Sequence, residues 1–106
     1  MADISRLHRE LIARVLGSDA TTTPELRRAA FDDTGLDEPM RSLVDKVALD
    51  ARSVTDEDIS AVRAAGLSED QIFEIVVCAA IGQADRQYTS ARAALAEATG
   101  EGPGRR

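Results

Sequence analysis

The chain has one cysteine, one histidine and no tryptophan among its 106 residues. A single cysteine excludes an internal disulfide, a Cys-x-x-Cys pair and a thiolate metal site. With only one histidine as well, the usual ligands of zinc or iron are missing, so we expect neither a metal nor another cofactor. The other aromatic residues are Phe31, Phe73 and Tyr88. The core must therefore be built from Leu, Ile, Val and the abundant Ala.

Positive charge and long apolar runs are also in short supply. The chain has 13 Lys and Arg residues against 19 Asp and Glu, and its net charge of -6 disfavours binding to DNA or RNA. No apolar run approaches the roughly 20 residues that span a bilayer, and the amino-terminal residues lack the pattern of a signal peptide. We therefore expect a cytoplasmic protein without a membrane partner. The bias toward Arg and Ala is typical of a bacterial sequence.

Apolar periodicity predicts an all-α fold, a compact bundle of about five helices that ends in a long helix. The length allows one domain, which we place at residues 1–99, with a flexible Gly-rich tail at 100–106. The predicted helices cover about residues 4–16, 24–31, 38–51, 56–65 and 69–98.

Capping signals at the start of the helices support these boundaries. Thr23 precedes a proline at the first helical position, and Thr55 with Asp58 resembles a capping box. Ser68 with Gln71 forms a full Ser-x-x-Gln capping box. The expected N-caps are therefore Asp3, Thr23, Thr55 and Ser68.

The last predicted helix is on the order of 45 Å long at 1.5 Å per residue, and Gly82 is its only weak point. Along its second half, apolar residues recur with alternating spacings of four and three, which is the pattern of helices that pack along their length. This seam consists of Val77, Ile81, Ala84, Tyr88, Ala91, Leu95 and Ala98. It can pack against another helix of the same subunit or against a second subunit, and the sequence leaves both interpretations open.

Three runs in the second half of the chain resemble one protein family. They are LVDKV at 43–47, VTDEDI at 54–59 and RAAGLS at 63–68, followed by an apolar helix that continues to Arg86. Together they are similar to the alkylhydroperoxidase-D-like, or carboxymuconolactone decarboxylase-like, family over about residues 40–98. The most specific element is the pairing of VTDED with RAAGLS. The resemblance implies an alkylhydroperoxidase-D-like helical fold that forms trimers, hexamers or other closed oligomers.

Redox members of this family use a Cys-x-x-Cys pair with a nearby His and Glu, and this sequence has no such pair. The resemblance therefore implies an accessory, binding or partner subunit, either a homo-oligomer or a companion of a related subunit that carries the cysteine pair. The alternative is a small decarboxylase- or isomerase-type enzyme with a site at a subunit interface, because the family's decarboxylases do not need that pair. A one-cysteine peroxidase is a third interpretation.

Glu74 and Cys78 are two candidate catalytic residues. Glu74 interrupts the apolar run at 72–77, where a buried carboxylate with a raised pKa would suit acid-base chemistry. The alternative for Glu74 is a salt bridge or contact with water. Cys78 lies about ten residues inside its helix, beyond the reach of the helix dipole that would stabilise a thiolate. It is either an inert buried cysteine or a lone peroxidatic thiol that exchanges a proton with Glu74.

His8, Arg86 and Tyr88 complete the set of candidates. His8 lies within the apolar stripe of the first predicted helix, either as a half-buried, hydrogen-bonded residue or as a catalytic base. Near Gly82, Arg86 would bind a carboxylate of a ligand and Tyr88 would donate a hydrogen bond to it. The alternative for Arg86 is an ion pair, together with Asp85, across an oligomer interface.

Overall fold

The structure is a computed structural model that describes residues 2–17 and 20–100. These residues form five α-helices and one short 3-10 helix without any strand, which confirms the predicted all-α class. The elements are α1 (Ala2–Gly17), α2 (Pro24–Asp32), α3 (Met40–Asp50), η1 (Ala51–Ser53), α4 (Asp56–Ala64) and α5 (Glu69–Thr99). Apart from Gly100, the predicted flexible tail lies outside the described residues.

Three of the four expected N-caps are confirmed. The hydroxyl of Thr23 accepts a hydrogen bond from the backbone N–H of Leu26 at 3.1 Å. The capping boxes at Thr55 and Ser68 both form completely. In each, the side chain at the third helical position accepts a hydrogen bond from the backbone N–H of the cap residue. The expectation at Asp3 was wrong, because α1 already begins at Ala2.

The third helix starts later than the sequence predicts. It begins at Met40 rather than at residue 37 or 38, with Pro39 as its N-cap. Glu38 still acts on this helix from outside, because its carboxylate accepts bonds from the backbone N–H of Ser42 at 3.2 Å and from the Ser42 hydroxyl at 2.6 Å. The side chain of Glu38 thus satisfies an N–H group of the first turn that has no partner within the helix.

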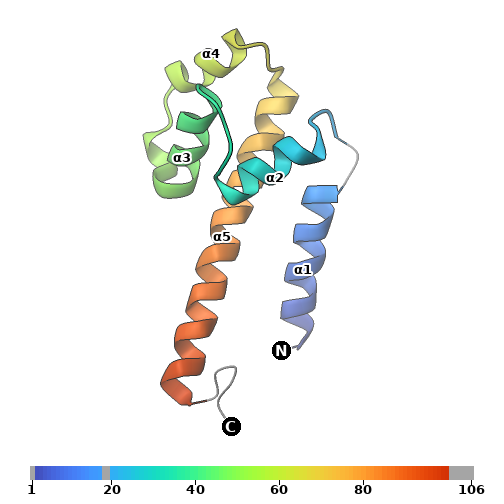
Figure 1. The fold of residues 1–106 in the computed structure, drawn as a ribbon, viewed down its shortest axis with the longest axis vertical. Coiled ribbons are helices and arrows are strands. Elements are labelled where there is room, and N and C mark those ends of the chain that lie inside the picture. Colours follow the sequence, from blue (N-terminus) through green and yellow to red (C-terminus); the bar gives the residue numbers. More distant parts are fainter. Residues whose placement is uncertain (1, 18–19, 101–106) are drawn as a thin grey trace.

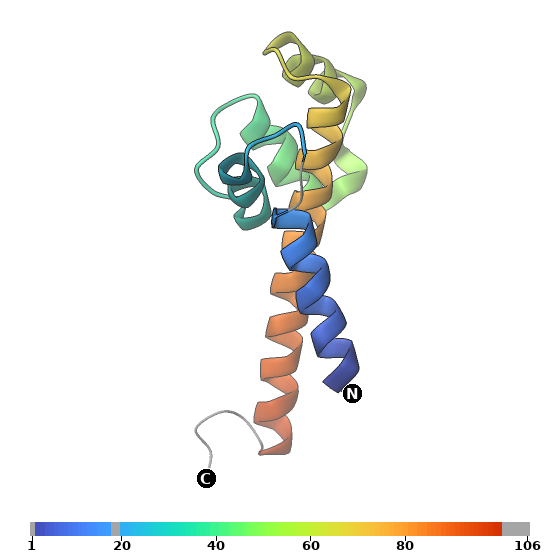
Figure 2. The same ribbon diagram turned by 90° about the vertical axis from the view of Figure 1, so that its right-hand side faces the viewer.

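The molecule is elongated rather than compact, which corrects that part of the prediction. Its extents are 54 × 28 × 21 Å, and its radius of gyration is 16.0 Å, whereas a compact domain of this length has a radius of about 13 Å. Figures 1 and 2 show the reason: α5 runs along most of the length of the molecule. We call α2, α3, α4 and the first half of α5 the head, and α1 with the second half of α5 the arm.

The core lies in the head, where α2 crosses the buried face of α5. Phe31 and Ala30 of α2 pack against Ile75, Cys78 and Ala79 of α5. A second cluster under α3 and α4 contains Leu43, Val62 and Ile72. The arm contributes less to the core, since α1 reaches it mainly with residues near its carboxyl end. No helix in the described ranges is long and apolar enough to cross a membrane.

Candidate functional site

The structure separates the five predicted site residues into three places. Glu74 and Cys78 line one pocket on α5, together with residues of α1 and α2. His8 and Tyr88 meet in the arm, between α1 and α5. Arg86 lies at the crossing of α5 with α2, where it contacts the backbone of α2. Glu74 and Cys78 therefore share a cavity, and Arg86 is not part of it.

Glu74 is held by the segment that precedes α2. One carboxylate oxygen accepts hydrogen bonds from the backbone N–H of Thr21 at 3.1 Å and from its hydroxyl at 2.9 Å. The other oxygen accepts equivalent bonds from Thr22, at 2.9 Å and 2.7 Å. Four donors from two consecutive residues thus converge on one carboxylate of α5.

These bonds determine the ionisation state of Glu74. Partial burial by itself would raise the pKa, but the hydrogen bonds from Thr22 and Thr21 favour the charged form and lower the pKa to about 2. The prediction from the sequence that Glu74 has a raised pKa was therefore wrong. An ionised Glu74 with filled acceptors anchors the connection between α1 and α2.

Cys78 lies at the floor of a pocket of about 150 Å³. Its side chain is buried, with 1% of the residue exposed, and burial raises the pKa of the thiol. The charge of Arg27 acts in the opposite direction, whereas that of Glu74 raises the pKa further. The thiol is thus protonated near neutral pH, which does not favour nucleophilic attack.

Arg27 lines the same pocket and was not a candidate from the sequence. Its guanidinium is buried and donates to the backbone carbonyl of Thr22 at 2.6 Å and to that of Leu16 at 3.1 Å. It therefore connects the end of α1 to the segment that holds Glu74. The sequence carries no signal for this role, because Arg27 and Arg28 are adjacent and look alike until packing buries one of them.

His8 and Tyr88 fix α1 against α5. His8 Nε2 donates to Asp85 Oδ1 at 2.9 Å, and the rings of His8 and Tyr88 lie 4.5 Å apart between centroids. The guanidinium of Arg92 also lies over the Tyr88 ring, 5.8 Å from its centre. The histidine is half-buried and hydrogen-bonded, as in the first of its two sequence interpretations.

Arg86 closes the crossing between α5 and α2. Its guanidinium donates to the carbonyl oxygen of Phe31 at 2.6 Å and to Oε1 of Gln83 at 3.0 Å. The Phe31 carbonyl belongs to the last turn of α2, where helix carbonyls lack partners and a cation is favourable. Arg86 thereby stabilises the end of α2.

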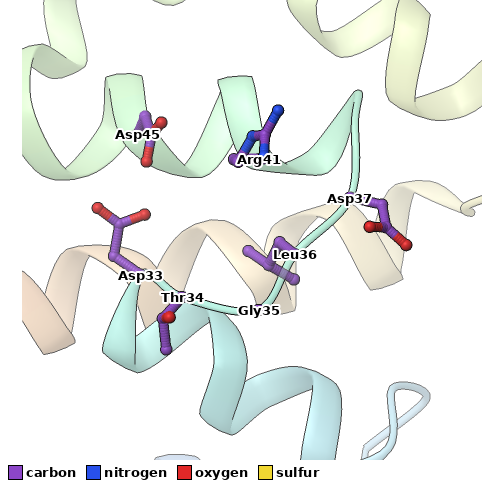
Figure 3. Close-up of a pocket in the computed structure, with 7 residues that line it drawn as sticks. All are labelled: Asp33, Thr34, Gly35, Leu36, Asp37, Arg41 and Asp45. Atoms are coloured by element: carbon purple, nitrogen blue, oxygen red, sulfur yellow. The ribbon is translucent and has the colours of Figure 1, made fainter.

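A larger pocket, of about 490 Å³, lies between the α2–α3 connection and α3. Figure 3 shows the carboxyl groups of Asp33 and Asp45 pointing toward one another across it, with Arg41 one turn before Asp45. Burial and a hydrogen bond with Asp45 raise the pKa of Asp33 to about 6, although the nearby charge of Arg86 lowers it. Sequence reasoning missed this pair, because nothing local brings two aspartates 12 positions apart into contact.

Asparagine in place of Asp33 should stabilise the protein at pH 7 and leave its stability unchanged at pH 4. The pKa of Asp33 is higher in the folded state than its ordinary value of 3.8. The carboxyl group of Asp33 therefore contributes fully to the free energy of unfolding below about pH 4, and this contribution is lost as the pH rises through 6. The free energy of unfolding that the wild type loses in this way is at most about 3 kcal/mol, and on the order of 1 kcal/mol after solvent screening. Asparagine also tolerates the positive φ of 54° at this position.

Urea unfolding at pH 4, 5, 6 and 7 measures this difference. The matched control is Asp37→Asn, the substitution of an exposed aspartate on the same pocket, which should change the free energy of unfolding by less than about 0.5 kcal/mol. If the stability of Asp33→Asn follows that of the wild type across the whole range, the two carboxyl groups do not share a proton.

No family model, no curated protein and no solved structure matches this chain. Within residues 2–17 and 20–100, no group of three or more His, Cys, Asp or Glu side chains is placed to hold a metal ion.

Proposed function

We propose that this chain is a noncatalytic accessory or binding subunit that works in an oligomer. The observation that carries the proposal is the unpaired apolar surface of the arm. Leu7 and Leu11 of α1 are 59% and 46% exposed, and Leu95 of α5 is 65% exposed. Two helices alone cannot enclose a core, so an arm of this kind gains stability when it packs against further helices.

The chemistry of the candidate residues supports the same proposal. Glu74 is an ionised anchor with four bonds, Cys78 is a buried and protonated thiol, and Arg86 binds the backbone of α2. Each of these side chains has a structural contact that a catalytic role would have to break. The resemblance to the alkylhydroperoxidase-D-like family favours a cytoplasmic homo-oligomer, or a complex with a related subunit that carries the cysteine pair.

Solution mass and thiol chemistry test the proposal together. We expect sedimentation equilibrium to show an oligomer at micromolar concentration, and we expect no peroxide turnover with thiol reductants. A strict monomer would contradict the assembly. Robust turnover that disappears in Cys78→Ser would contradict the noncatalytic assignment, provided that circular dichroism shows the variant to be folded.

A second candidate function is a decarboxylase- or isomerase-type enzyme, and one specific observation favours it. Asp33 has a pKa of about 6 and faces a pocket large enough for a small molecule, so it can give up or accept a proton near neutral pH. In this candidate Asp33 is the acid-base group and Arg41 binds a carboxylate of the substrate. The Asp33→Asn variant described above distinguishes the two functions, because it should abolish such turnover while it leaves assembly intact.

A further inference from the structure

The outward face of α5 is uncharged from Phe73 to the end of the arm. Its residues recur with spacings of three and four, which places them on one side of the helix, opposite the buried residues Ile75, Cys78 and Gly82. We call this face the outer stripe, and it consists of Phe73, Val76, Val77, Ala80, Ala84, Gln87, Ala91, Ala94, Leu95 and Ala98. All of these residues are exposed except Val76 and Val77, which are half-buried.

The outer stripe contains five of the seven residues of the seam that the sequence predicts, all except Ile81 and Tyr88. Ile81 packs against the core and Tyr88 against His8, so these two seam residues are used within the chain. The seam residues Ala84, Ala91 and Leu95 are left exposed. The interpretation that the seam packs within the chain is thus confirmed for one edge of the helix, and packing against a second subunit stays a prediction for the other edge.

Large side chains lie at the two ends of the outer stripe and small ones lie between them. Phe73 is 68% exposed and borders a mainly apolar groove of about 360 Å³ between α4 and α5. Ile59 and Ile72 also line this groove, together with the ion pair of Arg63 and Glu69. Leu95 is the large exposed apolar side chain at the other end of the outer stripe, in the arm. Ala84 lies midway, 11 residues from each. A two-fold axis at Ala84 would therefore bring Leu95 of one chain onto Phe73 and the groove of the other.

We propose that two copies of this chain pack antiparallel along α5, with the outer stripes in contact and the two-fold axis at Ala84. This inference rests on the proposed oligomeric function, and it specifies the surface through which the chains contact each other and the register of the two α5 helices. The alanines near the axis allow the two backbones to approach closely, and each apolar end contacts the opposite end of the partner. The interface is isologous, because each chain offers the same surface.

The distribution of charge decides between an antiparallel and a parallel pair. The head end carries the exposed acidic residues Asp56, Glu57, Glu69 and Asp70 at the starts of α4 and α5, and Glu69 among them pairs with the exposed Arg63. The described side chains of α1 include three exposed arginines, Arg6, Arg9 and Arg14, against the single exposed acid Glu10. A parallel pair would place two acidic ends together, whereas an antiparallel pair places the basic arm of each chain at the acidic end of the other. The antiparallel pair is favoured.

Disulfide cross-linking tests the register. Cys78 is the only native cysteine, so Cys78→Ala provides a background in which each new cysteine reports alone. In that background Ala84→Cys should form a disulfide-linked dimer under mild oxidation, because the two copies of residue 84 meet at the axis. The matched control, Thr89→Cys, is exposed on the opposite side of the same helix and should remain monomeric on a non-reducing gel.

Mixed cross-links test the direction of the two helices. Phe73→Cys and Leu95→Cys chains should each fail to link with themselves, because 22 residues of helix separate the positions by about 33 Å. An equal mixture of the two should give a heterodimer. Self-linking of Phe73→Cys would overturn the antiparallel pair in favour of a parallel one.

The dissociation constant of the dimer gives an independent readout. Leu95→Glu should raise it at least about 30-fold, since each dimer then buries two carboxylates against apolar surface. Thr89→Glu, the matched control, should leave it within about threefold. An oligomer that is insensitive to Leu95→Glu and lacks the Ala84→Cys link would overturn this inference but preserve the proposed function. A wild-type monomer at all concentrations would overturn both.

Discussion

Alanine in place of Gly82 should lower the free energy of unfolding by about 3 kcal/mol or more. Gly82 is buried where α5 crosses α2, and a Cβ at this position would overlap the carbonyl oxygen of Phe31 and lie 2.7 Å from its carbonyl carbon. The atoms in the way belong to the backbone of α2, so they cannot move without shifting that helix. The gain of about 1 kcal/mol in helix propensity from Gly to Ala is too small to compensate.

The same shift would also disturb Arg86, whose guanidinium binds the same Phe31 carbonyl at 2.6 Å. Urea unfolding at pH 7 measures the loss of stability. Gly17→Ala is the matched control, because a Cβ on Gly17 meets no atom within 4 Å, and its free energy of unfolding should not fall. A Gly82→Ala protein as stable as the wild type would show that α2 and α5 do not cross as closely as described.

The sequence predicted the local features of the fold well. Helix starts at Thr23, Thr55 and Ser68 depend on bonds between residues three positions apart, so the necessary information lies within one turn of the chain. The length of α5 was predictable for a similar reason, because no proline interrupts it between Ser68 and Gly100. Gly82 was identified as a weak point of that helix, yet the helix continues through it.

The role of Gly82 could not be read from the sequence, because it depends on which helix crosses it. The same applies to Glu74, whose partners Thr21 and Thr22 lie 53 and 52 residues earlier in the chain. Sequence alone indicates a carboxylate in an apolar run and predicts a raised pKa. The four donors that lower the pKa instead are the N–H and hydroxyl groups of Thr21 and Thr22, and no pattern in the sequence near Glu74 predicts this contact.

The seam of α5 shows how far periodicity can reach. The spacing predicted a packing face, and the structure places Tyr88 and Ile81 of that face against other parts of the chain. The spacing could not predict that α1 covers only one edge of the seam and leaves Leu95 exposed. The position of α1 on α5 depends on contacts between distant residues, such as the hydrogen bond of His8 to Asp85. The compact shape that we expected for the helical bundle was wrong, since the arm extends beyond the core.

Glutamine in place of Glu74 should lower the free energy of unfolding by about 2 kcal/mol at pH 7. The folded-state pKa of Glu74 is about 2 against an ordinary 4.5, which corresponds to a maximum of about 3 kcal/mol before solvent screening at this half-buried position. Glutamine keeps one acceptor, but its amide group would point its own hydrogens at donors of Thr21 or Thr22. The connection between α1 and α2 should loosen as a result.

The pH dependence separates this effect from a simple packing defect. Because the pKa of Glu74 is lowered by folding, its contribution is complete above about pH 4.5 and is lost as the pH falls toward 2. The difference between wild type and Glu74→Gln should therefore be constant from pH 5 to 7 and shrink below pH 4.5 in urea unfolding. Glu97→Gln, an exposed substitution on the same helix, is the matched control and should change the free energy of unfolding by less than about 0.5 kcal/mol. A deficit in Glu74→Gln that does not change with pH would indicate that the hydrogen bonds to Thr21 and Thr22 do not hold an ionised carboxylate.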